Sequence, residues 1–255
     1  MLDDSARLAL QDTRFADVRW CEEVESTNVT VAELARAGAP EGVVVVADHQ
    51  TGGKGRQGRR WQAPAGSSLL LSVLLRPRLP QAQVPATTLS MALAASDACE
   101  QVTGIRPLVK WPNDLVVDDR KLGGILGESI VEGGQMAVVV GIGLNVNWAT
   151  SPPAPGVALD ELVGSSVDRN ALLVALLRHL ERRYQALGEP DGPATLLSDY
   201  RARSATLGRR VRVELWAGAV EGEAVDVTAE GHLVVDEGGR TRVIASGDVI
   251  HLRPF

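Results

Sequence analysis

The chain has 255 residues, of which 45% are hydrophobic and 23% are charged, and its formal net charge is −6. This length predicts one large domain or two of unequal size, with enough apolar residues for a packed core, which excludes disorder along the whole chain. The acidic balance argues against broad nucleic-acid binding, although a nucleotide pocket needs only a few cations.

The first part of the chain predicts helices and strands in alternation. After a short terminal segment of 15 residues, Ser26 or Thr27 is placed to cap a helix, and the β-branched run after residue 42 is typical of a buried strand. In chain order we expect a helix at 29–36, strands at 43–47 and 68–75, and an Ala- and Leu-rich helix at 87–102.

The second part predicts short strands, then helices, then strands again. We expect strands at 115–117, 122–129 and 136–146, a hairpin turn at 132–134, and helices at 169–187 and 194–203. Alternating apolar residues then predict strands at 211–215, 225–227, 233–235, 242–245 and 249–252. Five short strands in so few residues indicate a small β-barrel or sandwich, so we place a domain boundary near Leu207 and Gly208. This gives domains at 1–207 and 208–255.

Several classes of protein are disfavoured. Cys21 and Cys99 are too few for a disulfide framework, and we interpret them as apolar fillers in a reducing cytoplasm. The four histidines lack the spacing of a structural zinc site, and the sequence leaves any metal ligands undetermined. No apolar run reaches the length of a membrane span, and the N-terminus does not resemble a signal peptide.

Residues 50–61, QTGGKGRQGRRW, hold four glycines and four cations, and no acidic residue occurs between Asp48 and Asp97. Glycine lets a backbone approach a ligand closely, while arginine and lysine bind phosphate and carboxylate oxygens. The pattern matches neither a Walker loop nor GxGxxG, so loop amides and side chains would hold the anion. The alternative interpretation is a solvated basic surface loop.

Three further motifs offer polar groups. In KWPNDL, residues 110–115, Asn113 and Asp114 lie at a turn, where a capped turn is the alternative. In DRKLGGIL, residues 119–126, Lys121 can point its amine into a cleft, although a surface lysine at a hairpin is commoner. In GIGLNV, residues 141–146, glycines inside a strand indicate a bulge, a close neighbour or a ligand.

The order of these motifs resembles the biotin protein ligase family (biotin–[acetyl-CoA-carboxylase] ligases). The matching segments are Ser26-Thr27-Asn28, GKGRQGR at 53–59, KWPND at 110–114, RKLGGIL at 120–126 and GIGLNV at 141–146. The resemblance covers roughly residues 17–252. It implies an α+β fold, with a catalytic domain like that of class II aminoacyl-tRNA synthetases, built on a mixed sheet, and a C-terminal small SH3-like β-barrel.

The resemblance also implies a two-step reaction. Biotin reacts with ATP, accompanied by Mg²⁺, to give biotinyl-5′-AMP, and the biotinyl group is then transferred to a lysine of a biotin carboxyl carrier domain of acyl-CoA carboxylase. The substrates supply both nucleophiles, so the protein needs to position them and neutralise charge. Some family members begin with a DNA-binding repressor domain. Only 25 residues precede Ser26, so we expect a cytoplasmic ligase with no DNA or membrane partner.

Site roles follow residue by residue from the same resemblance. The implied catalytic residues are Lys121, Arg56 and Asp114. The implied biotin contacts are Ser26, Thr27, Asn28, Gln50, Lys54, Gly55, Arg56, Lys121 and Gly124. The implied ATP contacts are Arg56, Arg59, Trp61, Asn113, Asp114, Lys121 and Asn145. Residues 52–60 are expected to be mobile when the site is empty and ordered over the adenylate.

One position departs from the family pattern, because Lys54 stands where the family loop usually has arginine. Lysine keeps the charge but loses the bidentate geometry of a guanidinium. Two other functions remain open at this point. A lipoate or octanoate ligase would share the catalytic fold, although its typical Arg-Arg…Ser-Gly-Gly-Gly loop and His-Asp pair are missing. A non-catalytic regulator that binds biotin or a nucleotide would not need Lys121, Arg56 and Asp114 together.

Overall fold

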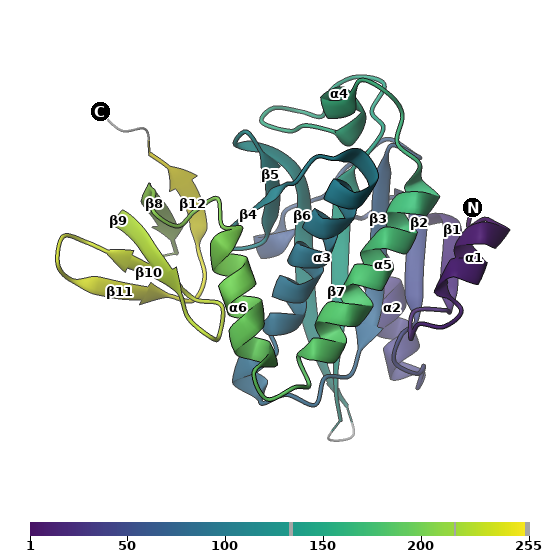
Figure 1. The fold of residues 1–255 in the computed structure, drawn as a ribbon, viewed down its shortest axis with the longest axis horizontal. Coiled ribbons are helices and arrows are strands. Elements are labelled where there is room, and N and C mark those ends of the chain that lie inside the picture. The colour runs from purple at the N-terminus through teal and green to yellow at the C-terminus, as the bar shows by residue number, and fades with distance from the viewer. Residues whose placement is uncertain (133–134, 217, 253–255) are drawn as a thin grey trace.

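The computed structural model describes residues 1–132, 135–216 and 218–252, which form two sheets flanked by helices (Figure 1). The larger sheet contains β1 (Val18–Val24), β2 (Val44–Gln50), β3 (Ser68–Leu75), β4 (Leu108–Lys110), β5 (Asp114–Val117), β6 (Arg120–Glu132) and β7 (Gln135–Asn145). Its strand order is β1-β2-β3-β7-β6-β5-β4. Among the described residues, β1 and β2 are the only neighbouring strands that run parallel, so the sheet is mixed, as predicted.

The helices cover the sheet unequally. They are α1 (Asp4–Leu10), α2 (Thr27–Arg36), α3 (Ala86–Thr103), α4 (Leu159–Val163), α5 (Arg169–Ala186) and α6 (Gly192–Ala202). Side chains alternate between the two faces of a strand, and Val44 and Val46 of β2 join the large core that α3 and α5 cover. Val43 and Val45 belong to a smaller cluster with Val31 of α2 on the other face.

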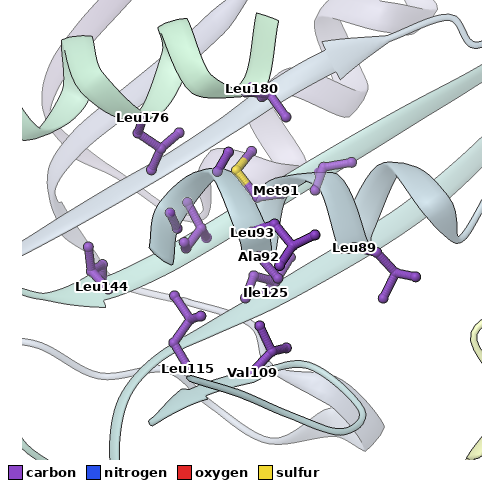
Figure 2. Packing of buried hydrophobic residues seen from close by; sticks show 14 of the residues in the cluster. Leu89, Met91, Ala92, Leu93, Val109, Leu115, Ile125, Leu144, Leu176 and Leu180 are labelled. Carbon is purple, nitrogen blue, oxygen red and sulfur yellow. The ribbon is translucent and has the colours of Figure 1, made fainter. Parts of the chain in front are cut away.

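The large core explains why the long helices were predictable. Figure 2 shows Leu176 and Leu180 of α5 on one side of α3, and Ile125 and Leu144 of the sheet on the other. All four are buried. Apolar residues at helical spacing mark the buried stripe of α5, whose N-cap Asp168 accepts hydrogen bonds from two backbone amides. The predictions at 87–102 and 169–187 are therefore confirmed within a residue at each end.

The smaller sheet is antiparallel and lies beside α6 (Figure 1). It contains β8 (Arg210–Leu215), β9 (Gly218–Val227), β10 (Leu233–Asp236), β11 (Thr241–Ile244) and β12 (Asp248–His251), in the order β11-β10-β9-β8-β12. The five predicted C-terminal strands are confirmed, although β9 begins seven residues before the prediction. The buried indole of Trp111 joins the two parts of the chain, because its Nε1 donates to the Gly231 carbonyl at 2.9 Å.

Some elements escaped prediction. The helices α1 and α4 are short, and β4 has only three residues. The strand β1 reads VRWCEEV and has no simple alternation, because it is an edge strand with several half-exposed or exposed side chains. Ser26 occupies the N-cap position of α2, but its side chain makes no capping hydrogen bond. The predicted hairpin turn at 132–134 lies largely outside the described residues.

The structure also bears on the two cysteines and on the predicted lack of a membrane-spanning segment. Cys99 is fully buried, and burial raises the pKa of its thiol to about 12, so that it stays neutral as an apolar filler does. Cys21 is half-buried and also free. Within the described ranges, no helix is both long enough and apolar enough to span a membrane.

A half-buried ion-pair cluster ties three helices together. Asp97 of α3 accepts a hydrogen bond from Arg183 of α5 at 2.8 Å and another from Arg203, the C-cap residue of α6. The Asp97 side chain is 11% exposed. Burial by itself would raise the pKa of Asp97, but the hydrogen bonds from Arg203 and Arg183 hold it below its ordinary value.

We expect Asp97→Asn to lower the free energy of unfolding by about 2–4 kcal/mol at neutral pH, because two half-buried guanidinium groups lose a shared counter-charge and only Arg183 keeps another partner, Asp199. Asp226→Asn, which breaks an exposed pair with Arg201, is the control and should cost less than about 1 kcal/mol. Because the folded pKa is depressed, the Asp97 contribution is present above about pH 4 and is lost as the pH falls through the folded pKa. Equal urea midpoints for the two variants would contradict this.

Candidate active site

A cavity of about 270 Å³ lies over the larger sheet. Its floor contains Gly124 of β6 and Gly141 and Gly143 of β7. Gly124 pairs with Gly143 across the two strands, so these glycines share one face. The neighbouring residues Ile125, Ile142 and Leu144 point to the other face and into the core. The strands therefore carry branched side chains on the core side and leave space on the cavity side.

Gly141 and Gly143 cannot carry side chains, because other residues lie too close to them. A Cβ on Gly143 would lie 2.6 Å from Cε2 of Trp61, and a Cβ on Gly141 would overlap Oδ1 of Asn28. A β-carbon cannot come this close to another heavy atom at either position. The sequence prediction of a close neighbour at these glycines is confirmed, and the neighbours are Trp61 and Asn28.

One wall of the cavity is polar and well ordered by hydrogen bonds. It contains Ser26, Thr27 and Asn28 at the start of α2 and Gln50 at the end of β2. Gln50 Oε1 accepts from the Thr27 backbone amide at 2.7 Å, and the Asn28 side-chain amide donates to Glu128 at 2.6 Å. These four predicted residues, separated in sequence, meet at one surface.

The opposite end of the cavity collects charge. Lys121 Nζ lies 2.6 Å from Asp114 Oδ1 and 5.7 Å from the Trp61 ring centroid, which is within range of a cation–π interaction. Lys54, Arg56, Arg59, Arg60 and Lys110 also line this cavity, whose only carboxylates among the described residues are those of Asp114 and Asp248. Such an excess of cations suits an anionic ligand.

Two predicted nucleotide contacts have protein partners here. Asn113 lines the cavity, and its side-chain amide donates to the Ile125 carbonyl at 2.7 Å. Asn145 is 5% exposed and donates to the Val157 carbonyl at 3.0 Å. Asn145 lies at the end of β7 and is absent from the lining of the cavity, unlike the other predicted site residues. Both amides are held by backbone carbonyls, which fixes their orientation.

A second cavity of about 520 Å³ lies on the far side of Gln50 and Trp61, which line both. Its other walls include Trp148, Pro64 and Pro153. Trp148 Nε1 donates to Ser68 Oγ at 3.3 Å, which fixes that indole against β3. The two cavities together offer a polar wall, a cationic centre and an aromatic slot.

The glycine-rich loop folds back on itself. The Gly55 amide donates to the Arg59 carbonyl at 2.8 Å, and the Trp61 amide donates to the Gly53 carbonyl at 2.9 Å. Gly58, with φ +74°, lies in the left-handed region that glycine adopts without strain. The loop therefore has a defined turn, with its cations presented to the cavity.

The C-terminal sheet also contacts this loop. Arg56 donates to Ser246 Oγ at 3.0 Å and to the Gly247 carbonyl at 3.3 Å, and Arg59 pairs with Asp248. Burial lowers the pKa of Arg56, although a guanidinium stays protonated at any physiological pH. Asp248 and Val249 line the main cavity, so residues from the end of the chain complete it.

Sequence reasoning missed several of these residues. Two of them carry weak signals. Ser72, whose hydroxyl contacts Thr27 and Asn28, is a polar residue inside the apolar run SLLLSVLL, and Trp148 is a tryptophan just after the GIGLNV motif. Ser246 and Asp248 carry none, because only the packing of the two sheets brings them to the loop. Among the described residues, no cluster of three or more His, Cys, Asp or Glu side chains is placed to bind a metal ion.

We expect Asp248→Ala to loosen residues 52–60, because Arg59 loses its counter-charge. An exposed pair contributes up to about 1 kcal/mol, so trypsin should cut within the loop about two- to fivefold faster. Glu221→Ala, which breaks a pair with Arg212 on the exposed face of the same sheet, should leave the rate unchanged. Equal cleavage of both variants and the parent would show that the contact does not restrain the loop.

Comparisons with known proteins support the family resemblance that the sequence motifs indicate. The model of the biotin/lipoate A/B protein ligase family matches residues 20–145, and that of the biotin protein ligase C terminal domain matches residues 206–252. The biotin–[acetyl-CoA-carboxylase] ligase of Mycobacterium tuberculosis is 41% identical over 89% of this chain and 86% of its own. The ligase of the same name from Paracoccus denitrificans is 32% identical, over 88% and 96%.

Among solved structures, the biotin protein ligase from Aquifex aeolicus, in complex with biotin and ATP, is similar over 94% of this chain and all of that one. The two share 28% sequence identity, and the TM-score is 0.80. The order of the motifs, the mixed sheet followed by a small antiparallel sheet, and these similarities agree. The chain belongs to the biotin protein ligase family.

Proposed function

We propose that this protein activates biotin with ATP as biotinyl-5′-AMP and transfers the biotinyl group to a specific lysine of a biotin carboxyl carrier domain of an acyl-CoA carboxylase. The observation that carries the proposal is a single cavity in which a hydrogen-bonding wall at Thr27 and Gln50 faces a cationic centre at Lys121. We assign the cavity to a catalytic domain, residues 1–207, completed by a C-terminal domain, residues 208–255.

Biotin occupies the polar wall and the glycine floor in this proposal. Its ureido ring needs both hydrogen-bond donors and acceptors, and its thioether ring needs apolar contact, which Leu126 provides. The residues assigned to biotin are Ser26, Thr27, Asn28, Gln50, Lys54, Gly55, Arg56, Lys121 and Gly124. At Lys54, the family's arginine is replaced by a point charge, so we assign it a contact by charge or backbone.

ATP occupies the cationic centre and the second cavity. Arg56, Arg59 and Lys121 bind the phosphates, and the indole of Trp61 packs against adenine, with Trp148 on the other side of the slot. Asn113 and Asp114 complete the nucleotide contacts, and Asn145, which lines neither cavity, serves ATP through the backbone that it positions. The side-chain amide of Asn113 already binds a backbone carbonyl, so its oxygen atom or its positioning of the neighbouring backbone serves ATP.

The chemistry follows from this placement. In the first step, a carboxylate oxygen of biotin attacks the α-phosphorus, and the bond to pyrophosphate breaks. Lys121 neutralises the charge that develops on both groups. In the second step, the carrier lysine amine attacks the biotinyl carbonyl, loses a proton and releases AMP. Asp114, which lies beside Lys121, orients that amine.

The oxygen donors of the cavity fit Mg²⁺ if phosphate oxygens of ATP supply most of its ligands. The described cavity lining supplies two carboxylates, Asp114 and Asp248, and each is paired with a cation. Protein sites for Mg²⁺ with ATP commonly use one or two carboxylates together with phosphate oxygens. When bound, the ion would screen the phosphate charge, and the carboxylates that line the cavity, Asp114 and Asp248, are the side chains that would supply its protein ligands.

The alternatives predict different substrates. A lipoate ligase would share the catalytic fold, but the relatives described above carry biotin ligase names and the C-terminal domain model is that of biotin protein ligases. A non-catalytic regulator would bind biotin without forming an adenylate. The free cysteines suit a reducing cytoplasm, where we place the protein. The proposal includes neither DNA nor a membrane as a partner.

We expect Lys121→Ala to reduce biotin-dependent exchange of pyrophosphate into ATP by at least about 100-fold, because removing a cation that stabilises the transition state costs roughly 3 kcal/mol. Arg120→Ala is the matched control, since its guanidinium pairs with Glu161 at the surface and does not line the cavity. The control should keep near-parental exchange. Near-normal exchange by Lys121→Ala would refute the assigned role, and a parent without exchange would refute the proposed function.

A further inference from the structure

Ser72 is a fully buried polar residue in the middle of the apolar strand β3. It lies directly opposite Gly141 of β7, so its side chain points to the cavity face of the sheet. Its hydroxyl oxygen is 2.6 Å from Asn28 Oδ1 and 2.8 Å from Thr27 Oγ1. A single hydroxyl therefore links β3 to the first two residues of α2.

The orientation of the Asn28 side chain is fixed from the other side. Its amide nitrogen donates to the Glu128 carboxylate at 2.6 Å and approaches the Leu126 carbonyl at 3.4 Å. The oxygen Oδ1 must then face Ser72. Within the described residues, Ser72 is its hydrogen-bond donor, and there is no room for another from β7, because a Cβ on Gly141 would collide with Oδ1.

Counting hydrogens shows what this leaves at Thr27. The Ser72 hydroxyl has one hydrogen, and Asn28 Oδ1 takes it at the shorter distance. The Thr27 hydroxyl has one hydrogen of its own, which it donates to Gln50 Oε1 at 3.1 Å. Ser72 Oγ is also placed to donate to Thr27 Oγ1 at 2.8 Å, but its one hydrogen cannot serve both acceptors. With that hydrogen committed to Asn28, Thr27 Oγ1 keeps an acceptor lone pair that no described residue fills. It remains an unfilled acceptor in the wall of the cavity.

We propose that Ser72 is a positioning residue for the biotin pocket, because its hydroxyl orients Asn28 and leaves Thr27 Oγ1 free to accept an N–H group of the substrate. The inference rests on the proposed function, since it takes biotin as the ligand. The ureido ring of biotin offers N–H donors, whereas the dithiolane ring of lipoate offers none. A buried acceptor left unfilled disfavours the substrate that lacks the donor.

A second buried serine supplies a matched control. Ser90 of α3 is also fully buried, and its hydroxyl has no hydrogen-bond partner among the described residues. Ser90→Ala thus removes a buried hydroxyl without disturbing the Thr27–Asn28 network. A general effect of losing a buried hydroxyl would affect both variants, whereas a positioning role would affect Ser72→Ala only.

The test measures biotin binding to the full-length protein by calorimetry without ATP, and biotin-dependent pyrophosphate exchange. We expect Ser72→Ala to weaken biotin binding about 5- to 100-fold, since Asn28 Oδ1 is left buried without a donor. The KM for biotin should rise by the same factor. The kcat and the KM for ATP should stay within about threefold, because Ser72 contacts neither Lys121 nor the loop arginines. Ser72→Cys, with a weak S–H donor, should be intermediate.

Three results would overturn the inference. They are unchanged biotin affinity in folded Ser72→Ala, an equal loss in Ser90→Ala, or a fall in kcat without a rise in the KM for biotin. If Ser72→Ala does not fold, the biotin affinity of Ser72→Cys is the test. Near-parental affinity in that variant overturns the inference. A parent that neither binds biotin nor exchanges pyrophosphate refutes the proposed function instead, so the two failures are distinguishable.

Discussion

The cavity depends on one packing constraint, the alternation of glycine with branched apolar residues along β6 and β7. Gly124, Gly141 and Gly143 face the cavity, while Ile125 and Ile142 face the core. Because the side-chain period of a strand is two, one segment can close a core on one side and hollow the other. Asn28 and Trp61 enter that hollow to distances at which a β-carbon would clash. These two side chains, which line the cavity, therefore need the glycines.

Charge in the cavity is organised by both parts of the chain. The larger sheet supplies the Lys121–Asp114 pair, and the last strand of the smaller sheet supplies Asp248, which pairs with Arg59. An arginine already held by a protein carboxylate is positioned before an anion arrives, which reduces the ordering cost of binding. The C-terminal sheet thus contributes directly to the site. The buried Trp111 indole, which donates to the Gly231 carbonyl, joins the smaller sheet to the larger one.

Most of the fold was predictable from the sequence, because long buried elements repeat apolar residues at the period of a helix or strand. The helix α5 and the strand β3 are examples. Edge strand β1 was missed because its half-exposed side chains break the alternation. The motif residues around Lys121 and Thr27 were predictable as candidates, and all but Asn145 line one cavity. Asp248 was not, since its importance arises only from tertiary contacts that no local pattern records. Ser72 carried only a weak signal, as a polar residue inside an apolar run.

The central claim is that one cavity couples biotin, ATP and a carrier lysine. The most direct measurement incubates the protein with MgATP and an isolated biotin carboxyl carrier domain, with biotin or lipoate in parallel, and locates the modified residue by mass spectrometry. The account predicts biotinylation of one carrier lysine, release of AMP, and no lipoylation under the same conditions. An unmodified carrier, or a carrier modified by lipoate in preference to biotin, would contradict it.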